Sequence, residues 1–305
     1  MSAERIVSLL PASTEILHAL GAGDRLVGRS HECDHPVSVQ ELPVCTSPRI
    51  DMSGSSRETD DQVRHLIRQG SSVYEVDPAV LRDLEPDMIL TQSQCEVCAV
   101  DTDTVHRAIK EGLEGDPTVL ELRASSYMGI LDDIRTVGNG IGKSAHGEKL
   151  VQEIEYHRQW FREEVIGLEE PTVASIEWID PLMAGGNWIP EIISSVGGHS
   201  LFGIGGEHSP FIQRDELLEA DPGIILVMPC GYDLKKTREE MKALTEWSQW
   251  KELSAVKNGQ VFLLEGNQYF NRPGPRIKES MRILAEVLHP DRFDPEMKGA
   301  GWEFL

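Results

Sequence analysis

Short apolar runs alternate with helix-like segments along the first part of the chain. The runs are rich in Val, Ile, Leu and Met and are bounded by Gly, Pro or charged residues, which predicts buried strands. Strands are predicted at residues 6–10, 26–28, 88–90 and 118–122. Helices are predicted between them at residues 11–20, 78–84 and 103–112. This alternation favours a parallel sheet with helices on both faces.

The same alternation restarts after Pro171. Strands are predicted at residues 172–176, 224–228 and 261–264, and helices at residues 190–196, 216–220, 241–251 and 275–288. The remaining tail, residues 290–305, carries Pro, Gly and Asp, and we expect it to pack loosely.

A mostly helical stretch is predicted between the two halves, at residues 126–168. Its later part, residues 146–166, lacks proline and has no glycine after Gly147. Twenty helical residues span roughly 30 Å, which predicts a rigid spacer. We therefore expect four parts. They are an N-terminal α/β lobe at 1–124, a helical connector at 125–169, a C-terminal α/β lobe at 170–290 and a tail at 291–305.

Composition narrows the classes of partner. The 305 residues carry a formal net charge of -22, so we expect no binding to nucleic acid and no attraction to anionic membranes. No apolar run approaches the roughly 20 residues of a membrane span, so no membrane insertion is expected. The chain starts Met1-Ser2-Ala3-Glu4-Arg5 and enters a predicted strand at once, without a signal-peptide pattern. A cytoplasmic location is therefore predicted.

Two short stretches concentrate thiols and imidazoles directly after apolar runs. The first contains His31, Cys33 and His35, and the second contains Cys95 and Cys98. Side chains just past the carboxyl ends of parallel strands line the ligand crevice of an α/β sheet, so these residues could converge on zinc, iron or an iron–sulfur cluster.

The alternative is that the two cysteines of the second stretch are small packed residues in a loop. Convergence of His31, Cys33 and His35 requires an extended segment, in which alternate residues face one side. In a turn they would diverge. The sequence offers no trusted nucleophile–base pair and no Walker or dinucleotide fingerprint. A binding protein is favoured over an enzyme, and the question of catalysis stays open.

Several segments occur in an order that is typical of one known family. They are Arg5–Glu15, Leu84–Leu90, Ile192–Gly198, Leu217–Ile225 and Arg272–Arg276. In this order the chain resembles the substrate-binding proteins of vitamin B12 and iron-chelate ABC transporters, the helical-backbone metal receptors. The resemblance implies a class III substrate-binding fold. Two Rossmann-like α/β lobes with parallel sheets would be joined by one long helix, with the ligand clamped between them.

The resemblance also implies a set of ligand-binding residues. Cobalamin-binding members hold the corrin ring largely with aromatic side chains, and the aligned positions here are Glu32, Gln92, Glu177 and Ser209. Arg272 keeps the family's residue. Neighbouring aromatic residues could rebuild an apolar wall, and they are Trp178, Trp188, Phe211, Tyr269 and Phe270. His208, in a glycine-rich loop, could reach a bound metal as an axial ligand.

The expected function is therefore a cytosolic binding protein for cobalamin, a related corrinoid or another metal chelate. The alternative is a metalloprotein or enzyme that uses the Cys/His set in the same cleft. In the family, one acidic residue on each lobe docks on permease arginines. One docking position falls on Asp215, and the other falls on Ala79, with Asp77 close by. This weakened pair makes an ABC permease a doubtful partner.

Overall fold

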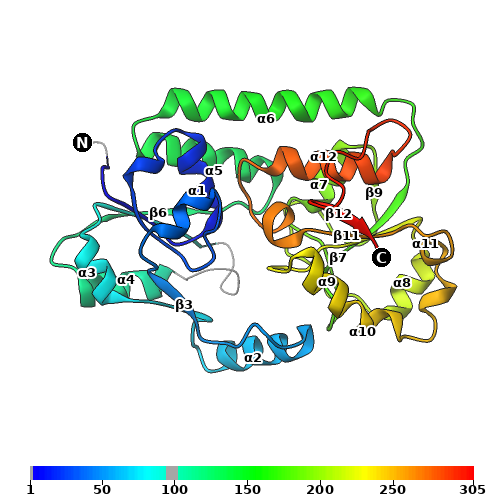
Figure 1. Ribbon diagram of the computed structural model, residues 1–305, viewed down its shortest axis with the longest axis horizontal. Coiled ribbons are helices and arrows are strands. Elements are labelled where there is room, and N and C mark those ends of the chain that lie inside the picture. The colour runs from blue at the N-terminus through cyan, green and yellow to red at the C-terminus, as the bar shows by residue number, and fades with distance from the viewer. Residues whose placement is uncertain (1–2, 94–101) are drawn as a thin grey trace. The chain divides into compact units, whose positions relative to one another are not determined.

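The computed structural model describes residues 3–93 and 102–305. The chain forms two compact α/β units (Figure 1). Unit 1 comprises Met1–Gly54, Glu58–Ala124 and Met128–Glu153, and unit 2 comprises Ser55–Arg57, Ser125–Tyr127 and Ile154–Leu305. Two α/β units, each built on a largely parallel sheet, confirm the predicted fold class.

Unit 1 contains a parallel four-stranded sheet with the strand order β2-β1-β5-β6. Its strands are β1 (Ile6–Ser8), β2 (Leu26–Arg29), β5 (Met88–Gln92) and β6 (Thr118–Leu122). A separate antiparallel pair is formed by β3 (Thr46–Pro48) and β4 (Tyr74–Val76), which the sequence did not predict. The four sheet strands were predicted from their short apolar runs, and β1 and β5 are buried along their whole length.

The helices of the first half cover this sheet and its neighbouring pair. They are α1 (Pro11–Ala19), η1 (Gly23–Arg25), η2 (Val37–Glu41), α2 (Ser56–Arg68), α3 (Pro78–Leu84) and α4 (Thr102–Gly112). Helix α2 was not predicted, because only Val63 and Leu66 of its partly buried apolar residues pack against the unit 1 core. Helix α3 was predicted, and the Asp77 carboxylate caps it by accepting the N–H groups of Ala79 and Val80 at 2.8 and 3.3 Å.

The connector consists of two helices, α5 (Tyr127–Gly140) and α6 (Ser144–Glu164). Between them, Gly142 has a φ of +73°, a conformation that ends a helix and that glycine adopts without strain. The predicted spacer is α6, which is drawn as one unbroken helix in Figure 1. Its first ten residues belong to unit 1 and the rest, from Ile154, belong to unit 2.

Unit 2 contains a mixed sheet with the order β12-β11-β10-β7-β8, and β9 pairs with the start of β7. Its strands are β7 (Thr172–Trp178), β8 (Met183–Ala184), β9 (His199–Ser200), β10 (Ile224–Val227), β11 (Val261–Leu264) and β12 (Trp302–Phe304). The three central strands are parallel, as predicted, whereas β8 and β12 pair antiparallel with their neighbours.

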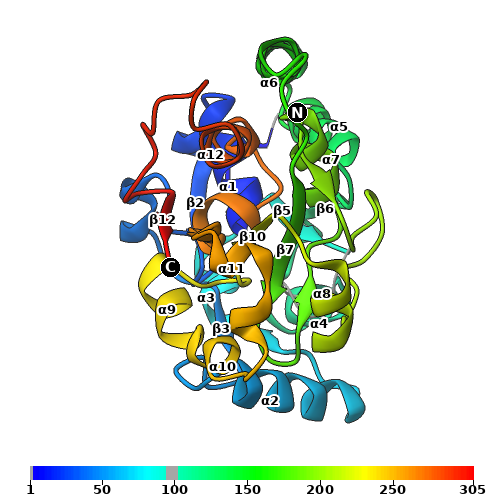
Figure 2. The ribbon, with the colours of Figure 1, turned by 90° about the vertical axis from the view of Figure 1, so that its right-hand side faces the viewer.

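Helices cover both faces of the unit 2 sheet. They are α7 (Ile189–Ser195), α8 (Arg214–Ala220), α9 (Leu234–Glu240), α10 (Lys242–Thr245), η3 (Trp250–Glu252), α11 (Ser254–Lys257), the π-helical turn η4 (Gly266–Phe270) and α12 (Ile277–Leu288). Figures 1 and 2 show α7 and α12 on one side of this sheet and α8 to α11 on the other. The single helix predicted at 241–251 is interrupted. Only α10 is α-helical in this range, and turn-type backbone bonds from Trp247 to Leu244 and from Trp250 to Trp247 lead into η3.

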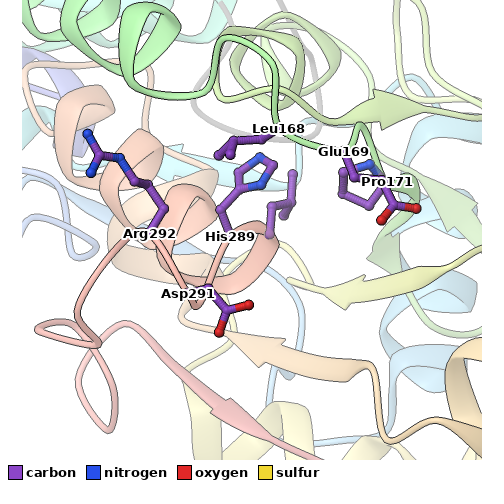
Figure 3. A pocket seen from close by; sticks show the side chains of 7 residues that line it. Leu168, Glu169, Pro171, His289, Asp291 and Arg292 are labelled. Carbon is purple, nitrogen blue, oxygen red and sulfur yellow. The ribbon is translucent and has the colours of Figure 1, made fainter.

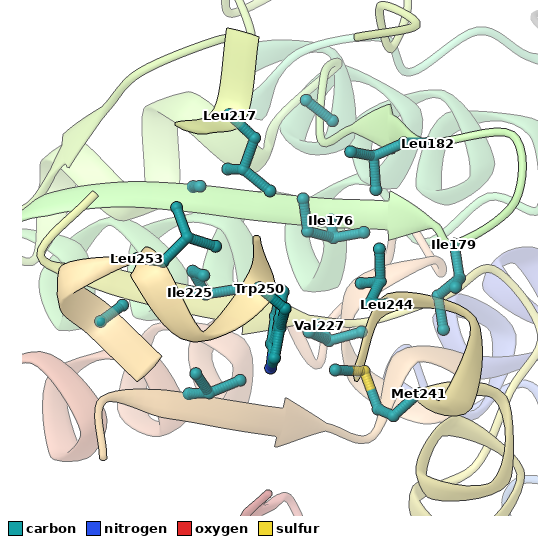
Figure 4. Close-up of a cluster of buried hydrophobic side chains, with 14 of the residues drawn as sticks. Ile176, Ile179, Leu182, Leu217, Ile225, Val227, Met241, Leu244, Trp250 and Leu253 are labelled. Carbon is teal, nitrogen blue, oxygen red and sulfur yellow. The ribbon is translucent and has the colours of Figure 1, made fainter. Parts of the chain in front are cut away.

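The core of unit 2 follows the two-residue period of its strands. Ile176, Ile225, Val227 and Leu263 project from one face and pack with residues from the helices that cover it, among them Trp250 (Figure 4). These side chains are almost completely buried. The strands that hold the candidate site are therefore fixed by a continuous apolar layer.

The tail does not pack loosely, so that prediction was wrong. Strand β12 pairs with β11, and Phe293 and Trp302 are buried at 5% and 4% exposure. The buried Glu286 carboxylate accepts the Met297 backbone N–H and the Trp302 indole N–H. The tail is thus fixed by hydrogen bonds from α12 and by aromatic contacts with Phe262 of β11 and Phe161 of α6. Composition alone does not show these contacts.

Candidate functional site

In unit 1, a group of polar side chains surrounds His31, two residues beyond the end of β2. Its Nδ1 lies 2.7 Å from Thr46 Oγ1, which also accepts the His31 backbone N–H at 3.0 Å. Thr46 donates its hydroxyl proton to Ser30 Oγ at 3.1 Å. The His31 ring packs against the Tyr74 ring at a centroid distance of 5.4 Å. Burial, and secondarily the Arg29 charge, lower the pKa of His31, which favours the neutral imidazole.

The structure separates the imidazoles and thiol of the first predicted metal-binding stretch. Residues 31–32 form a turn, so the extended geometry that convergence required is absent. Cys33 is buried, and its sulfur accepts the Thr14 hydroxyl at 3.1 Å. The His35 side chain is exposed. Cys33 therefore faces the hydroxyl groups at the start of α1, while His31 faces Thr46.

The second predicted metal-binding stretch, with Cys95 and Cys98, lies outside the described residues. Within residues 3–93 and 102–305, no group of three or more His, Cys, Asp or Glu side chains is placed to hold a metal ion. Of the remaining cysteines, Cys45 is buried in the unit 1 core, and burial raises its pKa to about 12. The zinc or iron–sulfur site stays a prediction.

The two predicted ligand residues of unit 1 are Glu32, in the turn that follows β2, and Gln92, at the end of β5. Glu32 is half-buried and its Oε1 accepts the Tyr74 hydroxyl at 3.3 Å. Gln92 is the last residue of β5 and is buried. Glu32 and His31 thus share Tyr74 as a neighbour, which the sequence did not identify. The signal was the alternating segment Val73-Tyr74-Glu75-Val76, which is typical of a strand.

In unit 2, a carboxylate and a hydroxyl group lie at the carboxyl end of β7. Glu177 Oε2 accepts the Ser209 hydroxyl at 2.7 Å and the Gly186 backbone N–H at 3.4 Å. Ser209 is buried, and its Oγ also accepts the Gly186 N–H at 3.1 Å. A side chain at Gly186 would collide with the Ser209 backbone at 2.5 Å, so glycine is required for this close approach.

A second group of unit 2 side chains follows β11. Trp188 is buried at the start of α7 and donates its indole N–H to the Phe270 carbonyl at 3.1 Å. Arg272 is only 5% exposed and donates from Nη2 to Asn267 Oδ1 at 3.0 Å. Phe270 is fully buried. The turn after β11 therefore holds the Arg272 guanidinium and the Phe270 ring in fixed positions, and Trp188 from the start of α7 is tied to the same turn.

The remaining predicted residues of unit 2 differ in exposure. The Trp178 ring packs on Tyr232 at 5.3 Å, and its buried indole N–H has no hydrogen-bond partner in the described part of the chain. Tyr269 lies under the Arg276 guanidinium at 5.3 Å. His208 is exposed, and its Nδ1 lies 3.0 Å from the Ser209 carbonyl oxygen. Phe211 is also exposed.

Glu265 is a candidate residue that the sequence analysis missed. It follows β11 directly and is 4% exposed. Its Oε2 accepts the Leu234 backbone N–H at 3.0 Å, while Oε1 is buried without a hydrogen-bond partner among the described residues. Burial raises the pKa of this carboxyl, and the nearby Arg272 opposes that effect. An acidic residue at the carboxyl end of a parallel strand was the signal that could have found it.

A surface pocket of about 350 Å³ lies elsewhere in unit 2 (Figure 3). It is lined by Leu168, Glu169, Pro171, Leu288, His289, Asp291 and Arg292. Pro171 precedes the first residue of β7, whereas Glu177 and Trp178 end that strand. The pocket is therefore at the opposite edge of the sheet from the candidate site, and His289 is engaged there with the Val196 carbonyl oxygen at 2.9 Å.

Two α/β units joined by a long helix are the architecture of class III substrate-binding proteins. The chain belongs to the periplasmic binding protein family, whose sequence profile matches residues 6–267. No helix among residues 3–93 and 102–305 combines the length and the apolar character needed to cross a bilayer.

Individual relatives are distant but match almost the whole chain. An uncharacterised ABC transporter substrate-binding lipoprotein of Bacillus subtilis is 24% identical over 301 residues, which cover 95% of this chain and 81% of the relative. A vitamin B12-binding protein of Vibrio cholerae is 24% identical over 298 residues, 94% and 89% of the two chains. The crystal structure of a periplasmic heme-binding protein from Pseudomonas aeruginosa matches with a TM-score of 0.70 at 17% identity, covering 95% of this chain and 94% of that one.

Proposed function

We propose that this protein is the substrate-binding component of an ABC importer and that it binds a metal chelate of the corrinoid or heme class. Family membership supports the binding role, and relatives described as vitamin B12-binding and heme-binding proteins support the ligand class. Cobalamin, the ligand expected from the sequence, is one member of this class.

The observation that carries the proposal is the Arg272 guanidinium, which Asn267 holds in a fixed position after β11. A guanidinium group donates in a fixed planar fork, which suits the carboxylate or amide oxygens at the rim of such chelates. The Trp188 indole N–H donates to the Phe270 carbonyl and so helps to fix the backbone two residues before Arg272. Arg272 Nη2 is already oriented by Asn267, so a ligand would meet a donor whose position is set beforehand.

The ligand is tested by titrating the purified protein with cyanocobalamin and, separately, with hemin, following calorimetric heat and visible absorbance. We expect saturable 1:1 binding of at least one of them. Arg272→Ala should weaken it by about 10–150-fold, since a hydrogen bond to a charged group contributes roughly 1.5–3 kcal/mol. Arg292→Ala, at the opposite edge of unit 2, is the matched control and should leave affinity unchanged. No binding of either chelate at high micromolar concentration would refute the proposal.

The sequence makes an ABC permease a doubtful partner. One relative is described as an ABC transporter substrate-binding lipoprotein, which supports such a partner for this chain. Asp215 is exposed in the first turn of α8, and Asp77 is exposed at the start of α3. Asp215→Lys should abolish binding to a vitamin B12 permease reconstituted in nanodiscs and measured by surface plasmon resonance. Asp291→Lys, an exposed acidic residue in the surface pocket, is the control. Equal binding by both variants would exclude Asp215 as a docking residue.

The cytoplasmic location predicted from the start of the chain stays a prediction. One relative is described as a lipoprotein and a structural neighbour as periplasmic. These descriptions favour a binding protein that works outside the cytoplasm. Fractionation of cells that produce the protein at natural levels, with antibody detection in each fraction, would distinguish the two locations.

A further inference from the structure

The hydrogen bonds around His31 fix which of its nitrogens carries the proton. Thr46 donates its own hydroxyl proton to Ser30 Oγ, so toward His31 its oxygen acts as an acceptor. It accepts the backbone N–H of His31 and, at 2.7 Å, the proton on Nδ1. The lone pair of the imidazole is therefore on Nε2.

This arrangement is the one that metal-binding histidines use. A histidine that ligates a metal through one nitrogen donates the other N–H to a nearby oxygen, which sets the tautomer and the ring orientation. Nε2 of His31 has no hydrogen-bond partner among residues 3–93 and 102–305. The ring is half-buried and rests on Tyr74, which further restricts its rotation.

Other groups in unit 1 are less suited to this role. The Cys33 sulfur is buried and accepts the Thr14 hydroxyl, and Cys45 lies in the core. The Glu32 carboxylate accepts the Tyr74 hydroxyl at 3.3 Å. Imidazole nitrogen suits iron, so the metal at the centre of an iron chelate would meet a suitable donor in His31.

We propose that Nε2 of His31 is an axial ligand to the metal of the bound chelate, held in the ligating tautomer by Thr46. This inference rests on the proposed function and narrows it to macrocyclic chelates with an exchangeable axial position. On binding, the Nε2 lone pair forms the metal–nitrogen bond and the water molecule in that axial position leaves. No electron or proton is transferred in this step.

The test is visible absorbance spectroscopy of the full chain mixed with hemin and with aquocobalamin. We expect the wild-type protein to shift the Soret band of hemin. His31→Ala should lose that shift, and added imidazole should restore it. Thr46→Val, which keeps the size of the side chain but removes the acceptor, should keep the shifted band and weaken affinity by about 10–100-fold. His146→Ala, an exposed histidine of α6, is the matched control. If His31→Ala does not fold by circular dichroism, His31→Gln replaces it.

The outcomes separate the two proposals. Hemin or aquocobalamin binding with identical spectra in wild type and His31→Ala would overturn the axial role and leave the proposed function standing. Loss of the band in His208→Ala instead would overturn it in favour of the unit 2 histidine. Unchanged affinity in Thr46→Val would overturn the assignment of the tautomer. Failure of the wild-type protein to bind either compound would refute both proposals.

Discussion

Replacing Glu286 tests how firmly the tail is attached to unit 2. Its carboxylate is 1% exposed and accepts four hydrogen bonds. The donors are Arg282 Nε at 2.8 Å, the Met297 N–H at 3.2 Å to Oε1 and 3.0 Å to Oε2, and Trp302 Nε1 at 2.8 Å. The tail in turn reaches the candidate site, because the Gly301 carbonyl accepts the Glu265 N–H at 2.9 Å.

Glu286→Ala leaves the Met297 and Trp302 donors buried without an acceptor, and it removes the ion-pair partner of Arg282. Each unsatisfied donor costs about 1–3 kcal/mol, and breaking a buried ion pair costs about 3–5 kcal/mol in total. Because the same carboxylate makes all of these contacts, the terms overlap. We expect the free energy of unfolding of unit 2 to fall by about 3–5 kcal/mol. Urea unfolding followed by tryptophan fluorescence measures it, with Trp302 as an internal reporter.

Glu296→Gln provides the control. Glu296 pairs with the same Arg282 at 3.1 Å, but its side chain is 68% exposed. Exposed ion pairs contribute about 0–1 kcal/mol, so this variant should stay within 1 kcal/mol of wild type. The reasoning is refuted if Glu286→Ala also stays within that margin, or if both variants lose the same stability.

Other variants probe single features of each unit. Burial raises the pKa of Asp133 to about 6, although it accepts the N–H groups of Arg123 and Ala124. The folded state therefore binds this proton more tightly than the unfolded chain does, so the contribution of this group to stability is full below about pH 4 and is lost, by about 3 kcal/mol in all, as pH rises through 6. Asp133→Asn should lose this dependence, and equal urea midpoints against pH in both proteins would contradict it. Trp250→Ala should destabilise unit 2 by about 3–5 kcal/mol in urea unfolding, because it empties the core beside β10, and a loss below 1 kcal/mol would contradict this. Arg272→Lys should recover little of the affinity lost in Arg272→Ala by calorimetry, since lysine lacks the planar fork, and full recovery would show that charge alone suffices.

The strands and longer helices of the fold were predictable because their signals are local. Strands such as β5, β10 and β11 are continuous buried runs, and α6 has helical spacing without a breaker. The segments missed were short and depend on distant partners. Strand β12 exists because it pairs with β11, and α2 presents few apolar residues to the core. Tertiary contacts, which a local pattern does not contain, decide such elements.

For the candidate site, the sequence could identify only residues that directly follow a predicted strand. The position after a strand drew attention to His31, Glu177 and the turn before Arg272, and their role in binding stays a prediction. Their partners come from other segments. Thr46 is 15 residues from His31, and Ser209 is 32 residues from Glu177. Whether His31, Cys33 and His35 converge depends on the backbone of one short loop, and that loop is a turn.

Two buried glutamates of unit 2 show how structural and binding roles can be separated. Glu286 and Glu265 are both almost inaccessible, at 1% and 4% exposure, so burial does not distinguish them. Both oxygens of Glu286 accept hydrogen bonds, whereas Glu265 Oε1 has no such partner within the described residues. A buried carboxylate oxygen without a donor is costly, and a purely structural residue gains nothing from it. The hydrogen bonds therefore assign Glu286 to the attachment of the tail, whereas Glu265 stays a candidate residue of the turn after β11.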